Sequence, residues 1–108
     1  MAQDYVILND ETENGMIAVN KSVFKAIAEI SIDEIEDALK VPNSRFTKPL
    51  DIRIENNRLN ISADVRLKYG ANVEQTCELV QNRIYENILF MTGFKPSNVT
   101  VNVSGFEN

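Results

Sequence analysis

Four carboxylates gathered in one short stretch are the residues of this sequence best suited to bind a metal ion. They are Asp33, Glu34, Glu36 and Asp37. Carboxylate oxygens are the ligands that calcium and magnesium prefer. However, adjacent positions of a helix point to different sides, and the stretch lacks the glycine-bearing spacing of a calcium loop. We therefore interpret these residues as the solvated first turn of a helix and predict no metal site.

Other catalytic chemistry has few residues to use. The chain has 108 residues, no histidine and a single cysteine, Cys77. The commonest general base is therefore missing, no cysteine pair can hold zinc, and no phosphate loop of the GxxxxGK type occurs. Cys77 falls on the apolar side of a predicted helix, where we expect a packed thiol and not a nucleophile. The sequence predicts a protein that is not an enzyme and takes no cofactor.

Three basic residues on the polar side of predicted strands could contact nucleic acid: Arg53, Arg66 and Lys68. RNA-binding sheets also stack bases on exposed aromatic side chains, but the central strands here offer no exposed Phe or Trp. The basic residues alternate with acids such as Asp51 and Asp64, and the net charge is −5, which opposes contact with phosphates. A small nucleic-acid-binding α/β plait is therefore the alternative hypothesis, and the charges argue against it.

A β-hairpin has the clearest pattern in the sequence. Residues 59–69 and residues 50–54 are apolar at every second position, which is the period of strands with one buried face. Tyr69 ends the inward row. Asn56 and Asn57 supply a two-residue turn, because Asn tolerates positive φ. This turn places three inward pairs opposite each other, which are Ile54 with Leu59, Ile52 with Ile61, and Leu50 with Ala63.

A long helix and a last strand follow the hairpin. From residue 73 the apolar residues recur at steps of three and four, which places them on one side of a helix. This side consists of Val73, Cys77, Val80, Ile84, Ile88 and Met91. The helix is expected to begin near Asn72 and to end at Gly93, which suits a helix C-terminus. A strand over residues 98–105 then has Val99, Val101 and Val103 inward.

The N-terminal part predicts a strand over residues 16–20, with Ile17 and Val19 inward, and residues 5–8 as a strand that pairs with it. A helix begins near Asn20. Its apolar side consists of Val23, Phe24, Ile27 and Ile30. Ser31 and Glu34 have capping-box spacing, so we predict a second short helix over residues 32–40. Its inward residues are Ile35, Ala38 and Leu39.

Together these elements predict one α+β domain over residues 1–108. Their order is strand, broken helix, strand, strand, helix, strand, which forms a two-layer sandwich with the helices packed on one face of the sheet. Residues 1–14 are either an N-terminal strand or a loosely attached tail. No apolar run reaches the ~20 residues of a membrane span and no secretory signal is present, so we expect a cytoplasmic protein without direct membrane insertion.

Four stretches, in this order and spacing, carry a family resemblance. They are residues 15–19 (GMIAV), residues 64–70 (DVRLKYG), residues 80–84 (VQNRI), and residues 91–94 (MTGF) followed by residues 99–103 (VTVNV). On these stretches the chain resembles the alkaline shock protein family, the envelope stress response family of Gram-positive bacteria. It departs from that family in its acidic predicted helix, where members often carry a Gly-Val turn. It also lacks the long charged tail of some members.

The resemblance implies a non-enzymatic interaction module that self-associates and docks to a protein partner. Some members sit at the membrane through an anchor protein and support envelope homeostasis, and others are tied to lipid metabolism. The protein is then cytoplasmic, or peripheral at the membrane through its partner, and forms a homo-oligomer. The family transfers no catalytic residues. Candidate partner contacts lie off the buried sides of the predicted elements and are Arg66, Lys68, Gln81 and Arg83.

Overall fold

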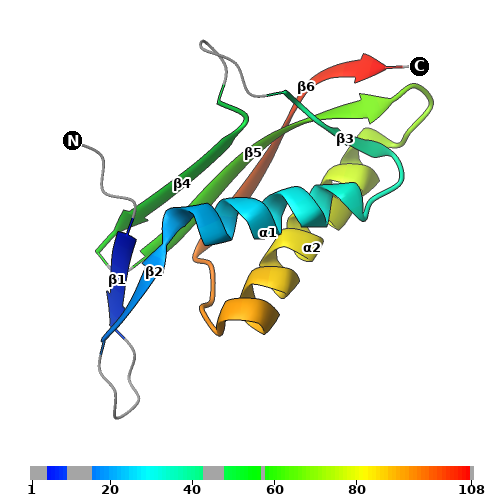
Figure 1. Ribbon diagram of the computed structural model, residues 1–108. Coiled ribbons are helices and arrows are strands. Elements are labelled where there is room, and N and C mark those ends of the chain that lie inside the picture. Colours follow the sequence, from blue (N-terminus) through cyan, green and yellow to red (C-terminus); the bar gives the residue numbers. More distant parts are fainter. Residues whose placement is uncertain (1–4, 10–15, 43–47, 57, 108) are drawn as a thin grey trace.

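The computed structural model describes residues 5–9, 16–42, 48–56 and 58–107 (Figure 1). Its elements are β1 (Tyr5–Asn9), β2 (Met16–Asn20), α1 (Lys21–Asp33), β3 (Ala38–Lys40), β4 (Leu50–Glu55), β5 (Arg58–Lys68), α2 (Val73–Thr92) and β6 (Asn98–Glu107). The last four strands form one sheet, and both helices cover the same face of it. This confirms the predicted α+β two-layer architecture.

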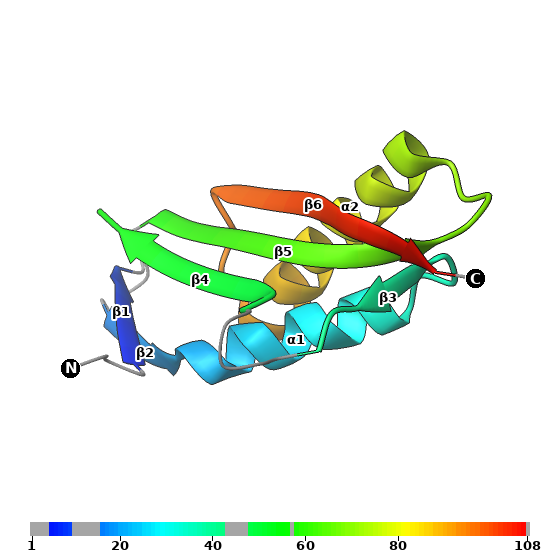
Figure 2. The same cartoon turned by 90° about the horizontal axis from the view of Figure 1, so that it is seen from above.

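β5 is the central strand of the four-stranded sheet (Figure 2). β6 runs parallel to it along residues 60–68. β4 and β3 run antiparallel to it, β4 along residues 58–63 and β3 along residues 65–67. A strand has two edges, and β6 occupies one of them, so β4 and β3 share the other, end to end. At their junction the Asp64 N–H donates to the Pro49 carbonyl at 2.7 Å.

The β4–β5 hairpin has the predicted register. Ile54 pairs with Leu59, Ile52 with Ile61 and Leu50 with Ala63. Asn56 adopts a φ of 52°, the left-handed conformation that the turn requires. The second turn residue, Asn57, lies outside the described residues. Turn chemistry and alternation agree here, and together they set the register.

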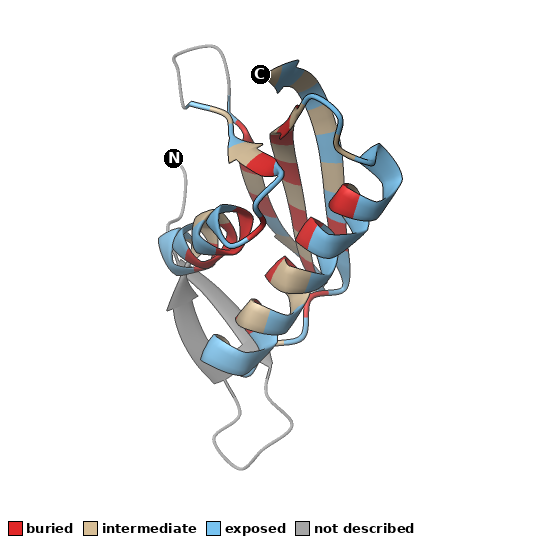
Figure 3. Cartoon of the chain, turned by 90° about the vertical axis from the view of Figure 1, so that its right-hand side faces the viewer, coloured by how far each residue is buried: buried red, intermediate tan, exposed pale blue. Residues whose placement is uncertain are grey.

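The core lies between the sheet and the two helices (Figure 3). Every second side chain of β5, from Leu59 to Leu67, is buried, and the intervening polar ones are half-buried. The helices contribute the residues that cover this row, which are Phe24, Ile27, Ala28 and Ile32 of α1 and Val80, Ile84 and Ile88 of α2. Val99 of β6 is buried as predicted, while Val101 and Val103 are half-buried against the same core.

α2 begins and ends where the sequence predicts. The Asn72 side chain accepts a hydrogen bond from the Gln75 N–H at 2.9 Å, and Gly93, at φ 79°, caps the C-terminus. The predicted apolar side is buried only in its middle, because Val73 and Met91 lie in the terminal turns and are exposed. The sequence reasoning also missed Thr76, which is buried.

The predicted second helix over residues 32–40 is wrong. α1 is continuous to Asp33, and the chain then turns and forms β3. Ser31 is not a cap, because its hydroxyl lies inside α1 and donates to the Ile27 carbonyl at 2.7 Å. Apolar residues three apart fit a turn followed by a strand equally well, and both Ile35 and Ala38 are buried.

Pairing with β5 explains why the chain leaves the helical conformation there. β4 stops at residue 63 of β5, so main-chain groups farther along this edge need another partner. β3 supplies it along residues 65–67, and the Lys68 N–H donates to the Asp37 carbonyl at 3.0 Å. Leu39 pairs with Arg66, which places it on the polar side of the sheet. The prediction that Leu39 points inward is therefore wrong.

Three further burial predictions also fail. Val23 and Ile30 of α1 are exposed, because the buried side of this helix runs through Phe24, Ala28 and Ser31. Tyr69 is 64% exposed and follows the end of β5. Its ring stacks on Phe106 at a centroid distance of 6.0 Å. Strand alternation thus predicts burial only along the part of β5 that the helices cover, and Tyr69 lies beyond that part.

β1 and β2 form a separate two-stranded antiparallel sheet. The pairing of the two N-terminal strands is therefore confirmed, but neither joins the main sheet. The structure does not describe residues 10–15 and 43–47. The predicted inward orientation of Ile17 and Val19 also lies outside what it describes.

Candidate interaction surfaces

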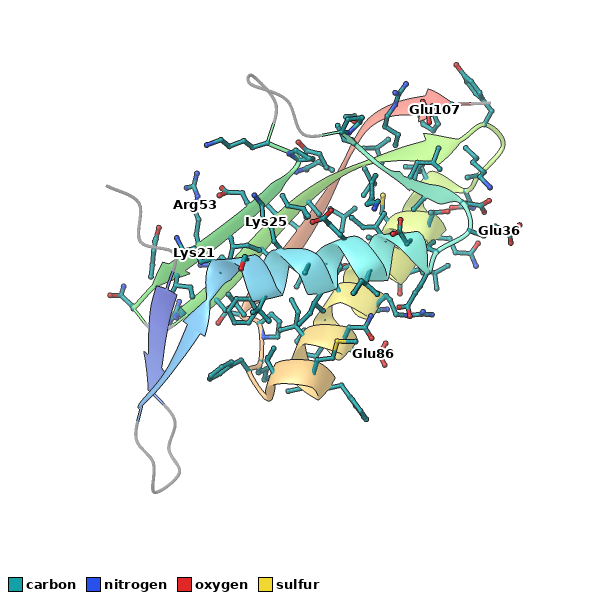
Figure 4. The ribbon with its side chains drawn as sticks, viewed as in Figure 1. Lys21, Lys25, Glu36, Arg53, Glu86 and Glu107 are labelled. Carbon is teal, nitrogen blue, oxygen red and sulfur yellow. The ribbon has the colours of Figure 1, made fainter. Side chains whose placement is uncertain are left out.

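The open face of the sheet, opposite the helices, is polar and internally paired. Arg66 Nη1 lies 3.0 Å from Glu107 Oε1, and Arg53 Nε lies 2.8 Å from Asp51 Oδ2. Figure 4 shows Arg53 and Glu107 at opposite ends of this sheet. Amide side chains continue the pairing from strand to strand, through Asn98 to Asn60 at 2.9 Å and Asn102 to Asp64 at 3.4 Å.

These pairs weigh against the nucleic-acid alternative. Two of its three basic residues, Arg53 and Arg66, already hold a carboxylate. The third, Lys68, is half-buried and has an acidic cross-strand neighbour, Glu107. Neither the arrangement nor the charge of this face favours a phosphate backbone.

A polar cluster joins the two helices. Asn87 Nδ2 of α2 donates to Ser31 Oγ and to Glu34 Oε1, at 2.9 Å each. Arg83 Nη1 lies 3.2 Å from the same Glu34 oxygen. The hydrogen bond from Asn87, and after it that from Arg83, lowers the pKa of Glu34 below the ordinary glutamate value. Arg83, which the sequence suggests as a partner contact, thus has a role inside the fold.

Gln81, the other helix residue suggested as a partner contact, links α2 to the last strand. Its Nε2 donates to the Val99 carbonyl of β6 at 2.8 Å. The remaining two, Arg66 and Lys68, lie on the open face of β5. The structure therefore does not gather the four suggested residues into one site. Their partners lie far away in the chain, so no local pattern could have indicated these contacts.

A groove of about 570 Å³ runs between α2 and β6. Its α2 wall presents Glu74, Cys77, Glu78, Gln81 and Asn82, and residues 99–101 of β6 form the other wall. Burial raises the pKa of the Cys77 thiol, so the thiol stays protonated at neutral pH and is a poor nucleophile. Cys77 is half-buried at the groove wall, rather than enclosed in the core.

Two smaller hollows lie elsewhere. One, of about 320 Å³, lies where β3 gives way to β4 and is lined by Ile32, Lys40 and Leu50 among others. The other, of about 280 Å³, lies on the open face near Arg53 and Asn60. Both contain hydrogen-bonding groups.

Large apolar side chains are exposed at the C-terminal end of α2. Leu89, Phe90 and Met91 are 40%, 92% and 56% exposed, and we call these three residues the α2 end patch. A phenylalanine that is almost wholly in water is unusual, because its burial would be favourable by about 2 kcal/mol. The sequence reasoning missed Phe90, since it falls off the predicted apolar stripe.

The carboxylates at the end of α1 do not converge. Glu34 faces Arg83, whereas Asp33 pairs with Lys40 at 3.1 Å. Within the described ranges, no group of three or more potential ligands could hold a metal ion. Likewise, none of the helices in the described part of the chain is both long and apolar enough to cross a bilayer.

These features define a small α+β domain. Its helices cover one face of the sheet, its other face is polar and internally paired, and one end of α2 is apolar. Over residues 9–108 the chain matches the model of the alkaline shock protein family, which is described by a cell envelope-related function. The chain belongs to this family, which confirms the resemblance seen in the sequence. The comparisons with curated proteins and with solved structures gave no match.

Proposed function

We propose that this protein is a non-enzymatic interaction module that acts in cell-envelope stress homeostasis or in the regulation of lipid metabolism. It does so by self-association and by docking to an anchor or regulatory protein. It works in the cytoplasm or at the membrane surface, where the docked partner holds it. Family membership supports the link to the envelope, and the exposed surfaces support the mode of action.

The α2 end patch is the observation that carries this proposal. Large exposed apolar side chains mark protein or membrane interaction sites and ligand-binding grooves, and these three surround the last turns of the helix. Phe90, at 92% exposure, can be buried against another molecule without any rearrangement of the core. Several polar residues of the described chain, by contrast, form internal pairs on the open face and between the helices.

Sedimentation velocity over a wide range of protein concentration tests self-association. We expect the protein to assemble as its concentration rises, and Phe90→Asp to shift it towards the monomer. Leu79→Asp is the matched control, because Leu79 is 50% exposed on the same helix but outside the patch. If both variants assembled to the same degree, the α2 end patch would not be part of the interface.

Binding to membranes tests the docking partner. The chain carries a net charge of −5, so it should not bind vesicles of anionic lipid. It should bind native membranes and lose that binding when the membranes are first treated with protease. A strictly monomeric protein that binds neither membranes nor any protein would overturn the proposed function.

A further inference from the structure

We propose that the groove between α2 and β6 binds an extended peptide segment of a partner protein. The segment adds to the main sheet as a strand beside β6 and places basic side chains against Glu74 and Glu78. This inference rests on the proposed interaction function and names the chemistry of the partner. It concerns a surface distinct from the α2 end patch.

The outer edge of β6 is well suited to accept another strand. β6 pairs with β5, and no other strand in the described ranges pairs with it. Its residues 98–106 contain no proline and no charged side chain, although proline and charge are the usual means of blocking a sheet edge. The single register shift lies opposite Val65 and Arg66, so the first half of β6 is regular.

The groove beside this edge is held open by the fold. The Gln81 side chain of α2 bonds to the Val99 carbonyl at 2.8 Å and fixes the helix relative to the strand. A strand added at the usual spacing of ~4.8 Å would direct every second side chain towards the α2 wall. Because the walls are already in place, binding requires little ordering of the protein itself. β-strand addition beside a helix is a known mode of peptide recognition.

The charges on the groove wall indicate which kind of peptide would bind. Glu74 and Glu78 are exposed on the groove wall, and basic side chains are absent from its described lining. Neither carboxylate forms an ion pair within the part of the chain that the structure describes. Residues four apart on a helix rise by about 6 Å, and alternate residues of a strand advance by ~6.8 Å. Lysine or arginine at alternate positions of the peptide therefore matches the two carboxylates.

The same charges oppose a second copy of this chain as the occupant. Two copies that paired through their β6 edges around a two-fold axis would each bring Glu74 and Glu78 to the shared interface. The strand itself, uncharged over residues 98–106, provides no compensating cation. A basic segment of another protein relieves this repulsion.

An eight-residue fluorescent peptide of alternating valine and lysine is the probe, and fluorescence anisotropy with the full chain is the measurement. We expect binding that falls about tenfold in Glu74→Lys/Glu78→Lys, since two exposed charge contacts are reversed. The control variant is Glu36→Lys/Glu86→Lys, which changes the net charge equally at exposed residues outside the groove (Figure 4). Circular dichroism verifies that both variants fold.

Main-chain pairing is tested with the same peptide methylated at alternate amide nitrogens in both possible phases. We expect at least one phase to lose binding, because a methylated amide cannot donate to the sheet edge. The bound peptide should also slow the alkylation of Cys77, which lies on the groove wall. Undiminished binding by both methylated peptides, equal weakening by the two double variants, or unprotected Cys77 would each overturn the inference.

These outcomes are separate from those that test the proposed function. If the chain self-associates through Phe90 but does not bind the peptide, the peptide-binding inference is wrong and the proposed function is unaffected. If instead self-association at high concentration protects Cys77 and excludes the peptide, a second copy occupies the groove and the proposed occupant is wrong.

Discussion

The two faces of β5 are made of alternating residues of one strand but have opposite relations to the rest of the chain. Towards the helices, the row that ends at Val65 and Leu67 is fully buried. Towards the open side, Asn60, Asp64 and Arg66 are half-buried and pair with side chains of β6. One face supplies the stability of the fold, and the other satisfies its own polar groups.

This difference shows where the molecule can act. A covered face cannot reach a partner, and a face whose charges are already paired offers little gain to one. The groups left without a partner inside the described chain lie at the margins. Among them are the outer edge of β6, the carboxylates Glu74 and Glu78 beside it, and the α2 end patch.

The sharpest test of this comparison replaces neighbouring residues on the two faces. Leu67→Ala removes a fully buried side chain and should reduce the free energy of unfolding by ~3 kcal/mol. Lys68→Ala, on the other face, should change it by less than about 0.5 kcal/mol. Urea denaturation at constant pH measures both. Similar losses would mean that the open face also contributes strongly to stability.

A smaller loss of stability is expected from a substitution at the C-terminal cap of α2. Gly93→Ala places a side chain at φ 79° and should destabilise the protein by ~1 kcal/mol. The space around the new Cβ is open, so the loss arises from the backbone. Gly105→Ala is the control, because the φ of Gly105 is not in the left-handed region and its Cβ would meet Arg66 Nε at an ordinary 3.6 Å. A neutral Gly93→Ala would contradict this account of the cap.

The polar cluster between the helices should make stability depend on pH. The pKa of Glu34 is lower in the folded protein, mainly because of the hydrogen bond from Asn87. Its contribution is therefore present above the ordinary glutamate pKa of about 4.3 and is lost as the pH falls through the lower folded value. Glu34→Gln should flatten the decline of the urea midpoint below about pH 5. Parallel curves for the two proteins would show that Glu34 is not involved.

The smallest effect is expected on the open face. The Arg53–Asp51 pair has side chains that are 70% and 48% exposed, so Arg53→Ala should change stability by less than about 0.5 kcal/mol. Arg83→Ala, which breaks the contact between the helices, should have the larger effect. Thermal unfolding in low and high salt measures both variants. A larger loss of stability in Arg53→Ala than in Arg83→Ala would contradict this prediction.

The sequence predicted those parts of the fold in which two local signals agree. Alternation and the Asn56 turn set the β4–β5 register, and Asn72 and Gly93 bound α2. The stretch after Ser31 failed because its capping-box spacing is local, whereas the unpaired edge of β5 that recruits β3 is set by tertiary structure. The predicted burial of Val73 and Met91, at the two ends of α2, failed for a related reason, since periodicity does not reveal where a sheet stops covering a helix.

The candidate sites were less predictable than the fold. Gln81 and Arg83 look free on a helical wheel, but their partners, Val99 and Glu34, lie 18 and 49 residues away. The groove combines one side of α2 with the edge of β6, and no spacing in the sequence joins the two. Phe90 could have been noticed as a large apolar residue off the stripe, which is the signal of an interaction surface in a helix that is otherwise amphipathic.

The parallel pairing of β5 and β6 also bears on how the chain folds. β5 meets β4 across a tight turn, but its contacts with β6 join residues 38 positions apart, with α2 between them. Closing that loop opposes early pairing, so we expect the hairpin to form first and the last strand to dock late, after α2 has packed. Mutations at Val99 should then change mainly the unfolding rate, while those at Ile52 should slow refolding.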